Sequence, residues 1–176
     1  VRALNQLMTT TQELIDAATR GELSYRADAS VCEGQYAEMI QSTNKLIDTI
    51  VEPLQVAATT INAQANGEFD LITQTFQGEY EVICSNVNNV SRTLQHMMQQ
   101  FVELDQAAKA GHLDFRGAPD AFEGSYREMI EIINRSLDQL IQPLKVSAKY
   151  MREISQGNNP GLLKQNYAGD FDEIKQ

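Results

Sequence analysis

The chain has 176 residues, of which 42% are hydrophobic and 22% charged, and its formal net charge is −10. This composition is typical of a folded protein and argues against a disordered tail. Because the 14 Lys and Arg residues are scattered along an acidic chain, the sequence argues against binding to nucleic acid or to an anionic membrane surface.

No stretch has the roughly 20 apolar residues that a helix needs to cross a bilayer. The best candidate, residues 46–54, contains Asp48, Glu52 and Pro53. The chain begins at Val1 and carries no signal peptide, which indicates a piece excised from a longer protein. We therefore expect this piece to be cytoplasmic, and anchorage of the parent protein in the inner membrane stays open.

Apolar residues recur at alternating steps of three and four positions along most of the chain, which is the spacing of a coiled-coil seam. The first run extends from Leu4 to Ala18. Three longer runs predict continuous helices near residues 35–65, 79–110 and 125–156. Pro53 and Pro143 fall inside two of these helices, where each removes a backbone hydrogen bond and is expected to kink the helix.

Pairs of glycines punctuate the helices. A first glycine follows each run and is expected to cap its C-terminus: Gly21, Gly67, Gly111 and Gly157. A second glycine precedes the next run: Gly34, Gly78, Gly124 and Gly169. The unit is therefore a helix, a connector and a second helix, and the second helix continues into the next unit.

These units define four tandem repeats. We place the first repeat at residues 1–51, the second at 52–95, the third at 96–141 and the fourth, which is incomplete, at 142–176. An offset of 90 residues aligns the first and third repeats without a gap, pairing for example Asp48 with Asp138. Alternate repeats therefore resemble each other most.

Connector length predicts the direction of the helices. The paired glycines enclose 12, 10, 12 and 11 residues, whereas antiparallel helices are usually joined by about 2–8 residues. An extended connector of this length can retrace a helix of about 16 residues, which is about 24 Å long. Parallel helices are therefore favoured, with apolar connector residues packed back on them: Leu23, Val31, Phe69, Phe76, Leu113 and Phe122.

Two parallel helices with narrow seams leave apolar surface uncovered. A second copy of the chain would cover it in a parallel four-helix bundle. The fold class that we predict is therefore all-α, with concatenated four-helix coiled-coil bundles formed by a parallel homodimer.

The pattern resembles the HAMP domain of bacterial chemoreceptors, sensor histidine kinases and adenylyl cyclases. The resemblance is carried by Pro53-Leu54 and Pro143-Leu144, by Gly21-Glu22-Leu23, and by the repeated Asn44, Asn88 and Asn134. It implies a dimeric module that relays a conformational signal from a sensor domain to an output domain. The habit of long HAMP arrays favours a methyl-accepting chemotaxis protein as the parent over a two-component kinase. The fourth repeat departs from the family pattern, because it reads Gly157-Asn158-Asn159-Pro160.

Several alternatives remain open at this point. The repeated asparagines either specify register as buried polar seam residues or lie at the seam edge and bond to connector backbone. Thr43, Ser91 and Ser147 either weaken the seam to allow two packings or are merely tolerated. The chain could also be a passive coiled-coil spacer, a helical-repeat scaffold of antiparallel pairs, or a helical sensor that binds a small molecule.

No catalytic, cofactor-binding or metal-binding residue can be named, so we do not expect an enzyme. His96 and His112 are isolated and are expected to be solvated, and the spacing of Cys32 and Cys84 matches no metal motif. We interpret both cysteines as small packing residues. No phosphate-binding loop or nucleophile motif is present in the sequence.

Overall fold

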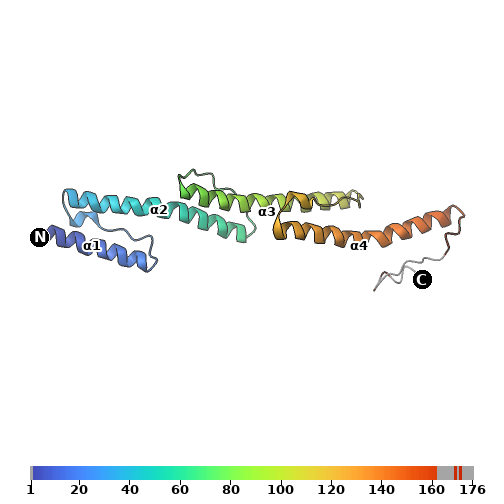
Figure 1. Cartoon of the computed structure of the whole chain (residues 1–176), viewed down its shortest axis with the longest axis horizontal. Helices are drawn as coiled ribbons and strands as arrows, with labels where there is room; N and C mark the ends of the chain where they lie inside the picture. Colours follow the sequence, from blue (N-terminus) through green and yellow to red (C-terminus); the bar gives the residue numbers. More distant parts are fainter. Residues whose placement is uncertain (1, 162–168, 170, 172–176) are drawn as a thin grey trace. The chain divides into compact units, whose positions relative to one another are not determined.

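The structure, a computed structural model, describes residues 2–161 together with 169 and 171 (Figure 1). In this part of the chain every regular element is helical. The α-helices are α1 (Arg2–Thr19), α2 (Gln35–Ala65), α3 (Glu79–Lys109) and α4 (Gly124–Ser155), and two short 3-10 turns are η1 (Ala29–Val31) and η2 (Pro119–Ala121). Residues 162–176 of the fourth repeat lie outside the described residues, apart from Gly169 and Phe171.

The three long helices lie where the apolar spacing predicts them, to within one residue at either end. Pro53 and Pro143 lie inside α2 and α4, and both helices continue past them. Both prolines are buried, so their rings add apolar packing at positions where the backbone loses a donor.

The four first glycines cap their helices as predicted. Gly21 has φ = 80°, which an L side chain rarely adopts, and its N–H donates to the Ala18 carbonyl. The Glu22 N–H donates to the Ala17 carbonyl, which completes a Schellman motif. The same pair of bonds recurs after Gly67, Gly111 and Gly157. Each helix therefore ends sharply and releases an extended connector.

The chain divides into two compact units, Val1–Leu94 and Gln95–Gln176, and helix α3 contributes residues to both. In the first unit a buried cluster joins α1, the first connector and α2 through Leu14, Ala27, Cys32 and Ile40. In the second unit Met97 of α3, Phe122 of the connector and Ile130 of α4 form the corresponding cluster. The boundaries of the four smaller repeats remain a prediction.

Contacts within the units follow the parallel order that connector length predicts. Leu7 and Ala37, near the starts of α1 and α2, pack on the same cluster. Ala18, at the end of α1, lines a small pocket with Ile50 and Val51, half-way along α2. Figure 1 shows the connector after α1 turning back so that α2 begins beside the start of α1.

The connector anchors only partly match the prediction. Phe122 is buried, whereas Leu23, Val31 and Leu113 are each more than 40% exposed. The buried residue of the first connector is Cys32 rather than Val31. Cys32 and Phe122 both lie two residues before the second glycine of their repeat, and this position is the one that faces the helices.

Much of each seam stays open to solvent on the single chain. Leu140 is 52% exposed and Ile61 is 53% exposed, although both lie on predicted seams. Other large apolar seam residues that are exposed include Leu4, Tyr36, Leu54, Val90, Tyr126, Leu144, Met151 and Ile154. Among the helices of the described residues, none combines the length and apolar character that crossing a membrane requires.

Candidate functional site

The repeated asparagines hold the connectors to the helices. The Asn44 side chain accepts a hydrogen bond from the Ala27 N–H (3.0 Å) and donates one to the Ala27 carbonyl (2.8 Å). Asn88 makes the same two bonds to Ile72, at 2.7 and 3.0 Å. Asn134 makes both bonds to Gly117, at 2.9 Å each. We call this two-bond contact the asparagine bracket.

The bracket resolves one alternative left open by the sequence. Each asparagine is partly buried and satisfies the backbone N–H and C=O of one connector residue. An amide side chain suits this task because it carries a donor and an acceptor side by side. In all three repeats the asparagine therefore fixes the connector, and the structure shows no role for it as a polar residue at the centre of the helix pair.

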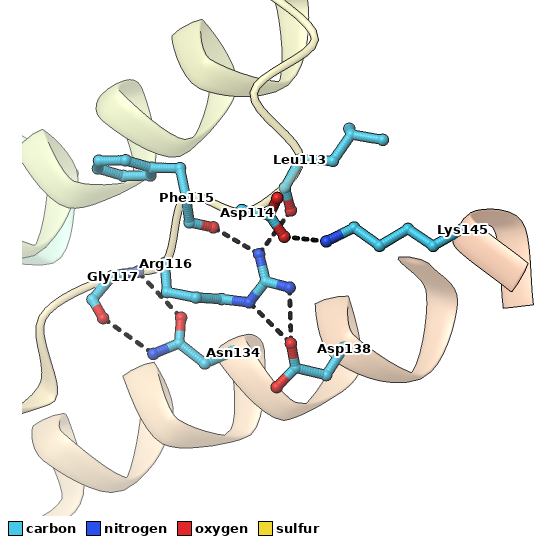
Figure 2. Close-up of polar contacts among 8 residues, drawn as sticks. All are labelled: Leu113, Asp114, Phe115, Arg116, Gly117, Asn134, Asp138 and Lys145. Carbon is cyan, nitrogen blue, oxygen red and sulfur yellow. Dashed lines mark hydrogen bonds and ion pairs between the residues drawn. The ribbon is translucent and has the colours of Figure 1, made fainter. Parts of the chain in front are cut away.

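A second contact, an arginine brace, accompanies the bracket in the first and third repeats. Figure 2 shows Arg116 with one nitrogen on the backbone carbonyls of Leu113 and Phe115 (2.7 and 2.6 Å) and two on Asp138 of α4. The two bonds to the Asp138 carboxylate measure 3.0 and 2.6 Å. The side chain of Arg116 is 23% exposed and that of Asp138 is 67% exposed. The guanidinium thus ties the turn of the connector to the helix one turn beyond the bracket.

The first repeat has the same arginine brace. Arg26 donates to the carbonyls of Leu23 and Tyr25, at 2.8 and 2.6 Å, and to Asp48 of α2 at 2.8 and 2.6 Å. Only arginine offers several donors in one rigid fork. The brace in both repeats depends on that geometry, because one side chain serves two carbonyls and a carboxylate.

The third connector approaches α4 closely at the bracketed residue. A Cβ atom on Gly117 would lie 2.9 Å from the Ile130 Cγ2 atom and within 4 Å of side-chain oxygens of Gln100 and Asn134. Ile130 is completely buried. Glycine at position 117 therefore allows the connector backbone to lie against the core of this repeat.

One ion pair extends this cluster beyond the third repeat. The Lys145 ammonium, on α4 just after Pro143, pairs with the Asp114 carboxylate of the connector. The hydrogen bond from Lys145, together with its positive charge, lowers the pKa of the Asp114 carboxyl below its usual value. In the first repeat Ser24 and Gln55 occupy the corresponding positions, 90 residues earlier, so the first connector cannot form this ion pair.

The second repeat has no arginine brace. Leu71 precedes its bracketed residue, and Arg92 stands where the other repeats have aspartate. Its connector is held instead by Ser91 of α3, whose hydroxyl donates to the Asp70 carbonyl (3.0 Å) and accepts from the Gln64 amide (2.8 Å). The Gln64 amide also donates to the Val87 carbonyl at 3.1 Å. We call Gln64 and Ser91 the polar layer of the second repeat.

The three small polar seam residues behave differently. The Thr43 and Ser147 hydroxyls bond to carbonyls one turn earlier in their own helices, Met39 and Pro143, at 2.9 Å each. Such bonds satisfy the hydroxyl within one helix and connect nothing else. Ser91 alone of the three joins another helix and a connector, and its side chain is fully buried.

The two histidines and two cysteines of the described residues do not lie together in one site. His96 is exposed as predicted, but its ring also lies against Phe122 with centroids 4.8 Å apart. His112 is exposed in the third connector. Cys32 and Cys84 are buried free thiols, and burial raises the pKa of the Cys84 thiol. Among the described residues, no three His, Cys, Asp or Glu side chains gather as metal ligands would.

Sequence reasoning missed both the arginine brace and the polar layer. The signal for the brace lies in the internal repeat, because the pairs Arg26–Asp48 and Arg116–Asp138 occur together and are replaced together in the second repeat. The polar layer carries a similar signal. Gln64 and Ser91 replace Ala18 and Ile47 of the first repeat in the same comparison.

Parallel helices joined by bracketed connectors define a class of helix–connector–helix repeat proteins. Within that class the chain matches the family described as the HAMP domain, at residues 31–96 and 121–176, which is more than half of its length. The chain therefore belongs to the HAMP domain family, whose members relay signals within sensor proteins. In the same comparisons it matches no curated protein and no solved structure.

Proposed function

We propose that this chain relays a conformational change from a sensor domain to an output domain as a parallel homodimer. Family membership supports the relay. The observation that carries the proposal is the open seam, because apolar residues on the predicted seams of all four α-helices stay exposed on one chain. Contiguous apolar surface of this kind marks an interaction site on a folded protein.

A second copy is the partner that fits this surface best. The open seam residues keep the three-four spacing of a coiled coil over α2, α3 and α4. Pairing of identical seams across a two-fold axis covers the same residues on both chains. Together with the parallel helices seen within each compact unit, this gives a parallel four-helix bundle.

A relay also needs connectors that follow the helices. The brackets fix one connector residue to the second helix of each of the first three repeats, and that helix continues into the next repeat. A displacement of one helix is therefore passed both to its connector and along its own axis. A population shift between two packings requires that they differ in free energy by only a few kcal/mol.

The relay can be tested by changing the input phase. A leucine-zipper coiled coil is fused before Val1 with zero, one, two or three inserted residues, each of which rotates the fused helix by about 100°. A cysteine introduced at Leu140 reports interchain crosslinking far from the fusion. We expect the crosslinking rate to vary with the number of inserted residues, with a helical period.

A passive spacer gives a different result in this experiment. If the crosslinking rate at position 140 is the same for every insert, the chain joins domains without relaying their orientation. A helical-repeat scaffold predicts a monomer without the fused zipper, which sedimentation equilibrium measures directly.

The long array of repeats supports a methyl-accepting chemotaxis protein as the parent.

A further inference from the structure

We infer that the polar layer of Gln64 and Ser91 holds the second repeat in a single helix register, whereas the apolar layers of its neighbours allow repacking. Gln64 and Ser91 act as positioning residues for the proposed relay, and the inference rests on that proposed function. The second repeat would then move as one body, and the conformational change would be confined to the first and third repeats.

The three repeats differ at one equivalent layer. This layer lies three residues before the first glycine on one helix and three residues after the bracketing asparagine on the other. The pairs of residues at these positions are Ala18 and Ile47, Gln64 and Ser91, and Ala108 and Leu137. The second repeat therefore has two polar side chains where the first and third have alanine with a large aliphatic residue.

The polar layer has a directional geometry that apolar layers lack. Ser91 has no exposed surface, and its hydroxyl is bonded at 2.8 Å to Gln64 and at 3.0 Å to the Asp70 carbonyl. Hydrogen bonds of this type are confined to about 2.7–3.2 Å, so a relative shift of about 1 Å breaks them. The broken state leaves a buried hydroxyl without a partner, which is costly.

The apolar layers respond differently to the same shift. Contacts between alkyl groups are non-directional, so the side chains of Ala18 and Ile47 can shift past each other without breaking a specific bond. Buried polar residues in coiled coils are known to select one register at some cost in stability. Along the chain, one polar layer lies between two apolar layers. The second repeat should therefore resist a shift of helix register that the first and third repeats permit.

The layer also reaches the connector. Ser91 bonds to Asp70, and Asn88, one turn earlier on α3, brackets Ile72 two residues further along the connector. Helix α2, helix α3 and the second connector are thus joined by five hydrogen bonds, two of them to Ile72. A shift of α2 along α3 must break both bonds from Gln64, whereas the three bonds from Asn88 and Ser91 hold the connector to α3.

Amide hydrogen exchange tests the inference, because the three bracketed amides give matched reporters in one molecule. We expect Ser91→Ala to speed exchange of the Ile72 amide by roughly tenfold, because the variant removes the hydroxyl that bonds both the Gln64 amide and the Asp70 carbonyl. Exchange of the Ala27 and Gly117 amides should be unchanged. Ser85→Ala, at an exposed serine of the same helix, is the matched control and should change none of them.

A second variant separates positioning from simple stability. Gln64→Ala combined with Ser91→Ile installs the layer of the first repeat. We expect the thermal midpoint to stay level or rise, while the Ile72 amide resonance splits or broadens because more than one register is populated. A single sharp resonance with unchanged exchange in this double variant would overturn the inference.

The outcome for the proposed function is read separately. Sedimentation equilibrium and the insert series with crosslinking at Leu140 report whether the chain dimerises and relays. One outcome is a chain that dimerises and whose crosslinking rate varies with the insert, while the exchange and line shape of the Ile72 amide stay unchanged in Ser91→Ala and in the double variant. In that case the relay stands and the positioning role of the polar layer fails. If the chain is a monomer with sharp, Ser91-dependent protection of Ile72, the layer only stabilises the helix pair.

Discussion

The second and third repeats hold their connectors with different chemistry. Both use an asparagine bracket, but the third adds a charged brace from Arg116 to Asp138, and the second adds the neutral polar layer of Gln64 and Ser91. The brace is on the surface, where charges interact through water, whereas Ser91 is fully buried. The asparagine bracket is thus common to both repeats, whereas the additional contacts that hold the connector differ between them.

The largest expected difference between the two repeats lies in their buried cores. Ile130→Ala removes a completely buried side chain next to Phe122 and Met97, and should destabilise the chain by about 2–5 kcal/mol. Cys84→Ala, six residues after the second glycine in the second repeat as Ile130 is in the third, removes a single sulfur atom and should cost roughly 1 kcal/mol. Urea unfolding followed by circular dichroism measures both losses of stability, and equal losses would contradict the expected difference between the two buried cores.

Removal of the bracket should affect the repeats equally. Asn134→Ala and Asn88→Ala each delete two hydrogen bonds to the backbone of one connector residue, and each should cost about 1–3 kcal/mol. Exchange of the Gly117 or Ile72 amide should accelerate in the corresponding variant only. Asn62→Ala, on the exposed face of α2, is the control, and a similar loss there would show that the effect is not specific to the connector.

The arginine brace should contribute less and should depend on salt. Arg116→Lys keeps the charge but loses the fork that serves two carbonyls and Asp138, and we expect a loss of about 1 kcal/mol or less. The part due to the ion pair should shrink as ionic strength rises. Stability of Arg116→Lys and of the native chain is compared in urea at low and high salt. Leu71→Lys in the second repeat, which has no brace, should show no corresponding salt-dependent loss.

The smallest effect should appear on acidification of the third connector. Because Lys145 lowers the pKa of Asp114, their contact is fully present above the unfolded pKa and is lost as pH falls through the lower folded pKa. A carboxyl carbon titration by NMR should therefore show Asp114 titrating below an ordinary aspartate, and Lys145→Gln should return it towards the ordinary value. An unchanged midpoint in that variant would exclude Lys145 as the cause.

The helices could be predicted because local rules agree along the chain. Alternating three-four spacing, a glycine at each helix end and connectors too long for antiparallel turns all point to parallel helices. The structure confirms the helices, their glycine caps and the parallel course of α1 and α2. These signals depend only on nearby residues. The bracket could be located but not interpreted, because an asparagine at a seam edge fits a core role and a connector role equally well until the path of the connector is known.

The remaining contacts join residues whose relation is set by the connector path. Arg26 and Asp48 are 22 positions apart, and no local pattern states that the connector brings one over the other. The sequence predicts Val31 as an anchor, but the buried residue is Cys32, which directly follows the turn at η1. The sequence does carry one signal for the brace. Its arginine and aspartate are both present in the first and third repeats and are both replaced in the second.

The proposed parallel dimer requires that two identical chains cover each other's open seams. A cysteine at Leu140, which is exposed on the single chain, is compared with one at Arg135, which lies on the outer face of α4. The native cysteines are buried and serve as the background, measured in the chain without an added cysteine. We predict rapid oxidative dimer crosslinking at position 140 and little at position 135. Equal crosslinking at both positions, or a chain that sediments as a monomer, would contradict the parallel dimer.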